Sequence, residues 1–91
     1  MKQQVKRVTL SGSWQKVSFE NKATRFFVKN FSTGDIFVSF AENDTEDESF
    51  RIASGIAEEV AISYTNIRGK YAVNDIYVKG SGEIEVQQLD F

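Results

Sequence analysis

The densest group of chemically active side chains in this chain is an acidic run between residues 42 and 48. Ca²⁺ binds roughly six to eight oxygen ligands, so a loop rich in carboxylates is a candidate calcium site. The spacing differs from that of an EF-hand loop, which needs a glycine at its sixth position and a glutamate at its twelfth. We favour a solvated loop that repulsion between its own charges keeps open. The candidate ligands are Glu42, Asp44, Glu46, Asp47 and Glu48.

Other carboxylates occur in pairs, as the acid and base of a glycosidase do. Glu58 and Glu59 are adjacent, and Glu83 and Glu85 are two positions apart. A glycosidase holds its two acids about 5–9.5 Å apart across a cleft. Both pairs instead fit the polar side of amphipathic strands, and a domain of 91 residues has little room for a deep cleft.

The residue types that the chain lacks restrict its chemistry further. It contains no histidine, no cysteine and no proline. Without cysteine, it has no disulfide, no thiolate metal site and no thiol nucleophile. Without histidine, a serine nucleophile would need lysine or a carboxylate as its base. Gly80 and Gly82 precede a strand rather than a helix, so they do not form a phosphate-binding loop. We therefore expect no enzyme activity, no catalytic residue and no cofactor.

Aromatic residues on the polar side of predicted strands point to binding instead. The tetrapeptide Asp35-Ile36-Phe37-Val38 returns almost unchanged as Asp75-Ile76-Tyr77-Val78. In both, isoleucine and valine alternate as core residues of a half-buried strand do, so the ring between them is expected to face away from the core. Phe27 stands between two apolar neighbours in the same way. We interpret the two tetrapeptides as equivalent strands in two sheets, because no fixed period recurs along the chain.

Two interpretations of these outward rings remain. If their strands share one sheet, the rings form a single exposed patch, and such patches usually mark an interface. Aromatic residues are also enriched in interface cores. Alternatively, the strands are central and both of their faces are covered within the monomer. The candidate interface residues are Phe27, Phe37, Tyr77, Lys29 and Lys79.

Trp14 is the only tryptophan, and it lies on the opposite phase from Val17 and Phe19. It is a candidate for stacking against a sugar ring, which makes a carbohydrate-binding module the alternative function. The more common role of such a residue is to cap the end of a sandwich core, with its N–H bonded to a partner.

Short strands carry all these residues. Apolar side chains recur at every second position in seven runs, and turn-forming residues separate the runs. Only residues 56–62 resemble a short helix, and too few residues are present to form a convincing one. We predict one all-β domain over residues 1–91, a small antiparallel β-sandwich of jelly-roll or Ig-like type with seven to eight short strands.

The distribution of charged and apolar residues argues against nucleic-acid and membrane partners. The net charge is −2 and the basic residues are scattered, whereas nucleic-acid binding usually needs a concentrated basic stripe. No apolar run approaches the ~18 residues of a membrane span. Residues 1–4 are not followed by the apolar stretch of a signal peptide. We expect no nucleic acid and no membrane among the partners.

Four stretches carry a family resemblance that covers most of the chain. They are Trp14-Gln15-Lys16-Val17-Ser18-Phe19, Phe27-Val28-Lys29-Asn30, Gly34-Asp35-Ile36-Phe37-Val38-Ser39-Phe40 and Asp75-Ile76-Tyr77-Val78-Lys79-Gly80-Ser81-Gly82-Glu83-Ile84-Glu85-Val86. This style of strand and turn resembles small all-β structural proteins of tailed bacteriophages. The resemblance implies a non-catalytic virion protein, of the head decoration, fibre or tail accessory type, that assembles in the host cytoplasm. Its expected partners are copies of itself or a capsid or tail protein.

Overall fold

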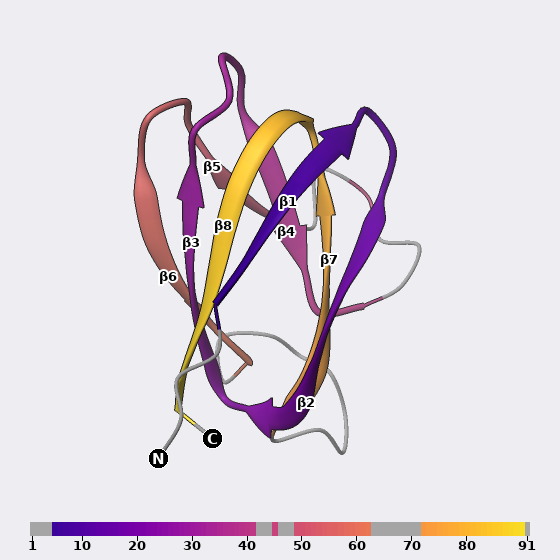
Figure 1. Ribbon diagram of the computed structural model, residues 1–91, viewed down its shortest axis with the longest axis vertical. Coiled ribbons are helices and arrows are strands. Elements are labelled where there is room, and N and C mark those ends of the chain that lie inside the picture. The colour runs from indigo at the N-terminus through magenta and orange to yellow at the C-terminus, as the bar shows by residue number, and fades with distance from the viewer. Residues whose placement is uncertain (1–4, 42–44, 46–48, 63–71, 91) are drawn as a thin grey trace.

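The computed structural model describes residues 5–41, 45, 49–62 and 72–90, which form eight strands in two sheets (Figure 1). The all-β prediction is confirmed. The strands are β1 Val5–Ser11, β2 Gln15–Ala23, β3 Arg25–Asn30, β4 Ile36–Ser39, β5 Phe50–Ile52, β6 Ala57–Ala61, β7 Val73–Lys79 and β8 Ser81–Asp90. None of the described residues belongs to a helix long and apolar enough to cross a membrane.

The strand order identifies the topology as a jelly roll. Sheet A has the order β1-β8-β3-β6, and sheet B has the order β2-β7-β4-β5. β1 pairs with β8, β2 with β7, β3 with β6, and β4 with β5, as in the two arms of one long hairpin. Ladders between β3 and β8 and between β4 and β7 show that this hairpin is rolled up on itself. This is the jelly-roll alternative of the prediction rather than the Ig-like one, whose sheets have a different strand order.

Residues 56–62, which resembled a short helix, contain strand β6. Val60 lies opposite Phe26 of β3, and both side chains are buried. Pairing with β3 satisfies the backbone groups along one edge of this segment, which is too short to form a stable helix alone.

The core lies between the two sheets and follows the period of two in the sequence. Among the described residues, the large apolar side chains that are fully buried are Phe26, Val28, Ile36, Val38, Ile52, Val60, Ile76, Val78, Ile84 and Val86. Rings of Phe19, Phe26, Phe40 and Phe50 continue the core as a row, with successive centroids 5.8, 5.9 and 6.2 Å apart. The residues between these core positions therefore lie on the outer faces of the two sheets.

The two Asp-Ile-aromatic-Val strands are neighbours in sheet B. Val38 of β4 lies opposite Val78 of β7 in an antiparallel ladder. The interpretation that placed these strands in two different sheets is therefore wrong. Rolling of the long hairpin brings β4 against β7, so similar strands that are 40 residues apart share one core face and one outer face.

Candidate binding faces

The outer face of sheet B brings together two of the predicted rings. Phe37 lies opposite Lys79, and Tyr77 lies opposite Ser39. Phe37 and Tyr77 are therefore diagonal neighbours, a relation that places Cα atoms about 7–8 Å apart in an antiparallel pair. Both rings are half-buried, so the single chain covers them only in part.

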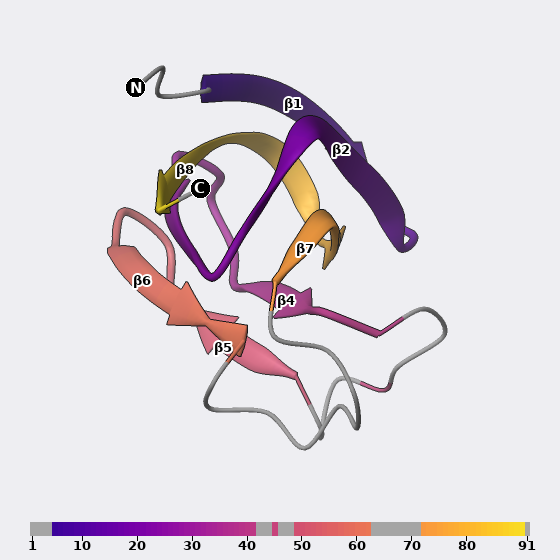
Figure 2. The same ribbon diagram turned by 90° about the horizontal axis from the view of Figure 1, so that it is seen from below.

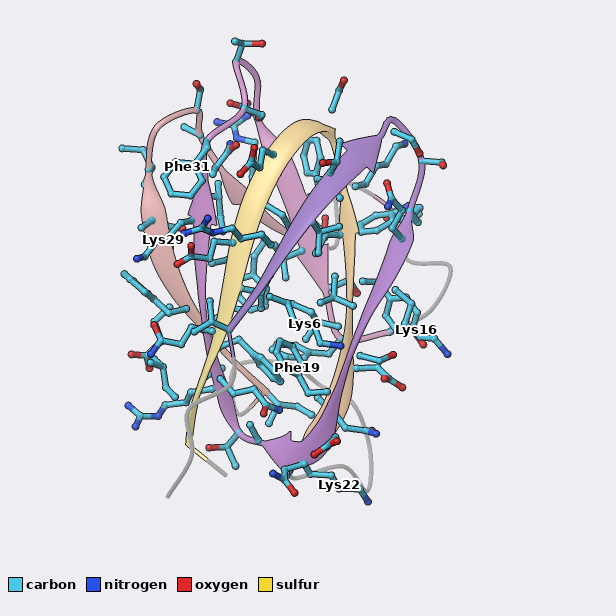
Figure 3. All side chains as sticks on the ribbon, viewed as in Figure 1. Lys6, Lys16, Phe19, Lys22, Lys29 and Phe31 are labelled. Atoms are coloured by element: carbon cyan, nitrogen blue, oxygen red, sulfur yellow. The ribbon has the colours of Figure 1, made fainter. Side chains whose placement is uncertain are left out.

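Cationic side chains alternate with these rings across the sheet. Tyr77 lies opposite Lys16 on its β2 side, and Phe37 lies opposite Arg51 on its β5 side. Lys16 is exposed and projects from β2 at the side of the molecule (Figure 3). We refer to this surface as face B, defined by Lys16, Phe37, Arg51, Tyr77 and Lys79.

Phe27 and Lys29, the other two predicted interface residues, lie on the opposite sheet. β3 belongs to sheet A, where Phe27 faces outward between Gln87 of β8 and Glu59 of β6. The Nζ atom of Lys29 is 5.8 Å from the centroid of the Phe27 ring. The three rings therefore do not form one patch, because the chain crosses from sheet A to sheet B between β3 and β4.

The outer face of sheet A neutralises much of its charge internally. Arg7 and Lys29 both bind the Glu85 carboxylate, with N···O distances of 3.1 and 3.4 Å. The hydrogen bond from Arg7 is the largest effect on the Glu85 carboxyl; desolvation opposes it, and the hydrogen bond and charge of Lys29 add to it, so that the pKa of Glu85 is lowered below its usual value. Arg25 binds Glu59 at 3.4 Å. On face B, Arg51 binds Asp35 at 3.6 Å, with both side chains largely exposed.

The most exposed large apolar side chains at the end of the sandwich were missed by the sequence analysis. Phe31 is 59% exposed and Ile56 is 47% exposed. The Asn30 N–H donates to the Ile56 carbonyl at 3.0 Å, so the two segments lie side by side. Figure 3 shows Phe31 beyond the end of β3. Phe31 lies in a turn, where the alternation of apolar and polar residues does not predict which side chains are exposed. The sequence feature that could have identified it is a large aromatic residue among turn-forming residues.

Trp14 directly precedes β2 and is half-buried. It is not among the side chains that form the core cluster of the described residues. Gln15 lies opposite Val78, so the same register places Trp14 beside Lys79. Trp14 shares the strand phase of Lys16 and therefore extends face B by one position.

The sequence analysis found no Ser-x-x-Lys motif of the kind that some serine hydrolases use, and this was wrong, because Ser13 and Lys16 have that spacing. Both residues are exposed, Ser13 in the β1–β2 connection and Lys16 on β2. Ser13 lies in a bend rather than on a strand, so the alternation of β2 does not place its hydroxyl beside the Lys16 amine.

The five carboxylates considered as calcium ligands, Glu42, Asp44, Glu46, Asp47 and Glu48, lie outside the described residues. Within the part of the chain that the structure describes, no three Asp or Glu side chains are grouped so that they could hold a metal ion.

Comparison with known proteins finds no matching family model, no matching curated protein and no matching solved structure.

Proposed function

We propose that this protein is a non-catalytic interaction module that associates through face B with other protein chains, including copies of itself. The observation that carries the proposal is the β4–β7 ladder, which sets Phe37 and Tyr77 side by side on one outer face. Covering these half-buried rings would contribute ~25 cal/mol for each Å² of apolar area removed from water.

The charge on face B describes the partner surface that would fit it. Lys16 and Arg51 flank the two rings in register. A complementary surface would present apolar groups interspersed with carboxylates, since opposed charges favour encounter and fix the register of two proteins. Cations on both outer faces bind carboxylates of the same chain: Arg7, Arg25 and Lys29 do so on sheet A, and Arg51 binds Asp35 on face B in a largely exposed pair.

The resemblance to structural proteins of tailed bacteriophages supports a virion as the setting. Head decoration, fibre and tail accessory proteins act as repeated copies, and symmetric repetition multiplies weak contacts. Jelly rolls occur in viral capsid proteins and in lectins, so the fold accommodates this proposal without selecting it. The partners would be copies of this chain or a capsid or tail protein.

Sedimentation velocity over a range of concentrations tests the proposal. We expect the unmodified protein to form concentration-dependent oligomers, and the double variant Phe37→Ser/Tyr77→Ser to form them at least about tenfold more weakly. Phe31→Ser is the matched control, because it removes a more exposed ring that does not belong to face B. Thermal melting of each variant checks that the fold is retained. A strictly monomeric protein, or equal loss of association in the control, would contradict self-association through face B.

Carbohydrate binding is the second candidate, and the position of Trp14 favours it. Trp14 continues face B beside Lys79, which gives that face a third ring. Because it is the only tryptophan, its fluorescence reports on this position alone. Titration with neutral and anionic oligosaccharides should shift or quench the emission if sugars stack there, and Trp14→Ala should abolish binding measured by calorimetry. Unchanged emission across a broad glycan panel would remove this candidate.

A further inference from the structure

We propose that copies of this chain also join edge to edge, with β1 of one copy adding to β6 of the next so that sheet A continues across copies. β1 and β6 are the outermost strands of sheet A within the described part of the chain. Figures 1 and 2 show them at opposite edges of that sheet. The outer edge of such a strand presents backbone donors and acceptors that another strand can pair with. On β1, the Gln15 side chain accepts a hydrogen bond from the Ser11 N–H at 2.7 Å and donates one to the Thr9 carbonyl at 3.3 Å, so an incoming strand has to displace this side chain there. This contact uses a surface other than face B and does not depend on it.

The two edges carry opposite charge. β1 contains Lys6 and Arg7, and β6 contains Glu58 and Glu59. Pairing β1 with β1, or β6 with β6, would bring like charges together, which is destabilising in facing strands. Pairing β1 with β6 brings opposite charges together. Charge repulsion therefore disfavours the symmetric β1–β1 and β6–β6 contacts, and charge attraction favours the head-to-tail β1–β6 contact.

Strand direction allows the same contact. Every neighbouring pair in sheet A is antiparallel, so β1 and β6 also run in opposite directions. A copy of β1 placed beside β6 in the same orientation of the sheet therefore continues the antiparallel pattern. On β1, Arg7 is on the outer face of the sheet, opposite Glu85 of β8 in the same chain. On β6, Glu59 is on that face, opposite Phe27 of β3 in the same chain.

Placing the outward-facing residues of β1 opposite those of β6, with Arg7 facing Glu59, defines the pairing register between the two copies. Arg7 of one copy lies opposite Glu59 of the next, which sets Thr9 opposite Ala57 and Val5 opposite Ala61. Within one chain, an ion-pair row runs from Lys29 through Glu85 to Arg7, whose side chain is 74% exposed. Glu59 of the next copy, with a side chain that is 41% exposed, would extend this row by one carboxylate.

Lys6 holds the β1 edge in position for this contact. Its Nζ atom donates a hydrogen bond to the Ser18 carbonyl of β2 and lies 5.3 Å from the centroid of the Phe19 ring. Figure 3 shows Lys6 beside Phe19. An inward-pointing charge of this kind usually protects an edge strand from non-specific pairing. Here it also ties the edge of sheet A to the edge of sheet B, which leaves Arg7 as the outward charge of β1.

The chain has no cysteine, so engineered cysteines test the register without interference. Thr9→Cys and Ala57→Cys are made as separate single variants, both at exposed positions. Residues directly opposite in antiparallel strands have Cα atoms about 4.5–5.5 Å apart, within the range that a disulfide spans. After mild oxidation of the mixture at low salt, intact mass spectrometry should show mainly the heterodimer. Homodimers of either variant in equal yield, or no heterodimer, would overturn the proposal.

Two controls separate the edge contact from random collision and from face B. Lys16→Cys lies on face B, and mixed with Ala57→Cys it should give little cross-linked product. Adding Phe37→Ser/Tyr77→Ser to both cysteine variants should leave the heterodimer intact, because the edge contact does not use face B.

Charge reversal tests the electrostatic basis. Arg7→Glu in the Thr9→Cys chain should lower the heterodimer yield about tenfold, and Glu59→Arg in the Ala57→Cys chain should restore it. High salt should weaken the contact between unmodified edges. A yield indifferent to Arg7→Glu would overturn the proposed register, and circular dichroism would verify that each variant is folded.

Discussion

Asn30 uses every polar atom of its side chain inside the sandwich. Its Nδ2 donates to the carbonyls of Gly34 and Ile52 at 2.8 and 3.0 Å. Its Oδ1 accepts hydrogen bonds from the N–H and the hydroxyl of Ser32 at 2.9 and 2.6 Å. These bonds connect the end of β3 to the β3–β4 turn and to β5. The side chain is therefore a structural element and not a surface group.

Replacing Asn30 with alanine should destabilise the fold strongly. The change removes the amide bonds to the buried Ile52 carbonyl and the Ser32 N–H, while the Gly34 carbonyl keeps its bond from the Ser32 hydroxyl. Each buried group that loses its partner costs about 1–3 kcal/mol. We expect a loss of at least about 2 kcal/mol in the free energy of unfolding, measured with urea. Asn21→Ala, at an exposed position, is the control and should change stability by less than about 0.5 kcal/mol. Equal effects of the two variants would contradict this account of Asn30.

The Glu85 carboxylate should make stability depend on pH. Arg7 and Lys29 lower its pKa in the folded state, so its contribution is complete above the ordinary value of 4.5 and is lost as pH falls through the lowered value. The stability difference between the unmodified protein and Glu85→Gln should therefore be largest near neutral pH and should shrink on acidification to about pH 3. Urea unfolding at the two pH values measures it, with Glu83→Gln as the control. A difference that grows on acidification would contradict the assignment.

At the scale of elements, close approach of two turns constrains Gly82 in β8. Its φ is +123°, and a Cβ atom at this position would lie 2.6 Å from the Cβ of Ser32. Gly82→Ala should therefore lower the free energy of unfolding by more than about 1 kcal/mol. Gly34→Ala is the matched control, because no atom lies within 4 Å of the corresponding position. Similar thermal melting of the two variants would show that the contact is not important.

The positions of most strands could be predicted from the sequence, but the pairing of the strands within the two sheets could not. The alternation of apolar and polar residues predicted the core positions of β4 and β7, and it predicted that Phe37 and Tyr77 face away from the core, as they do. β5 was not among the predicted runs, because Phe50–Ile52 is too short to show alternation. The pairing of β4 with β7 could not be predicted from the sequence either, because it depends on how the whole long hairpin rolls up. For the same reason Phe27 could not be assigned to the opposite sheet.

At the scale of the whole molecule, the two proposed contact surfaces lie on different parts of the sandwich. Face B occupies the outer side of sheet B, and the charged edges β1 and β6 limit sheet A. A head-to-tail contact closes into a ring or continues as a filament. Face B of every copy in such an assembly would remain available for another partner. This arrangement suits a protein displayed in many copies on a larger particle.

Residue-resolved NMR across a dilution series shows directly whether face B becomes covered as the protein associates. With increasing protein concentration, the amide signals of Lys16, Phe37, Tyr77 and Lys79 should shift together as face B becomes covered. Signals of β1 and β6 should shift with a separate, salt-sensitive dependence. Shifts confined to the outer face of sheet A around Phe27 and Phe31, or no shift at any concentration, would contradict association through face B.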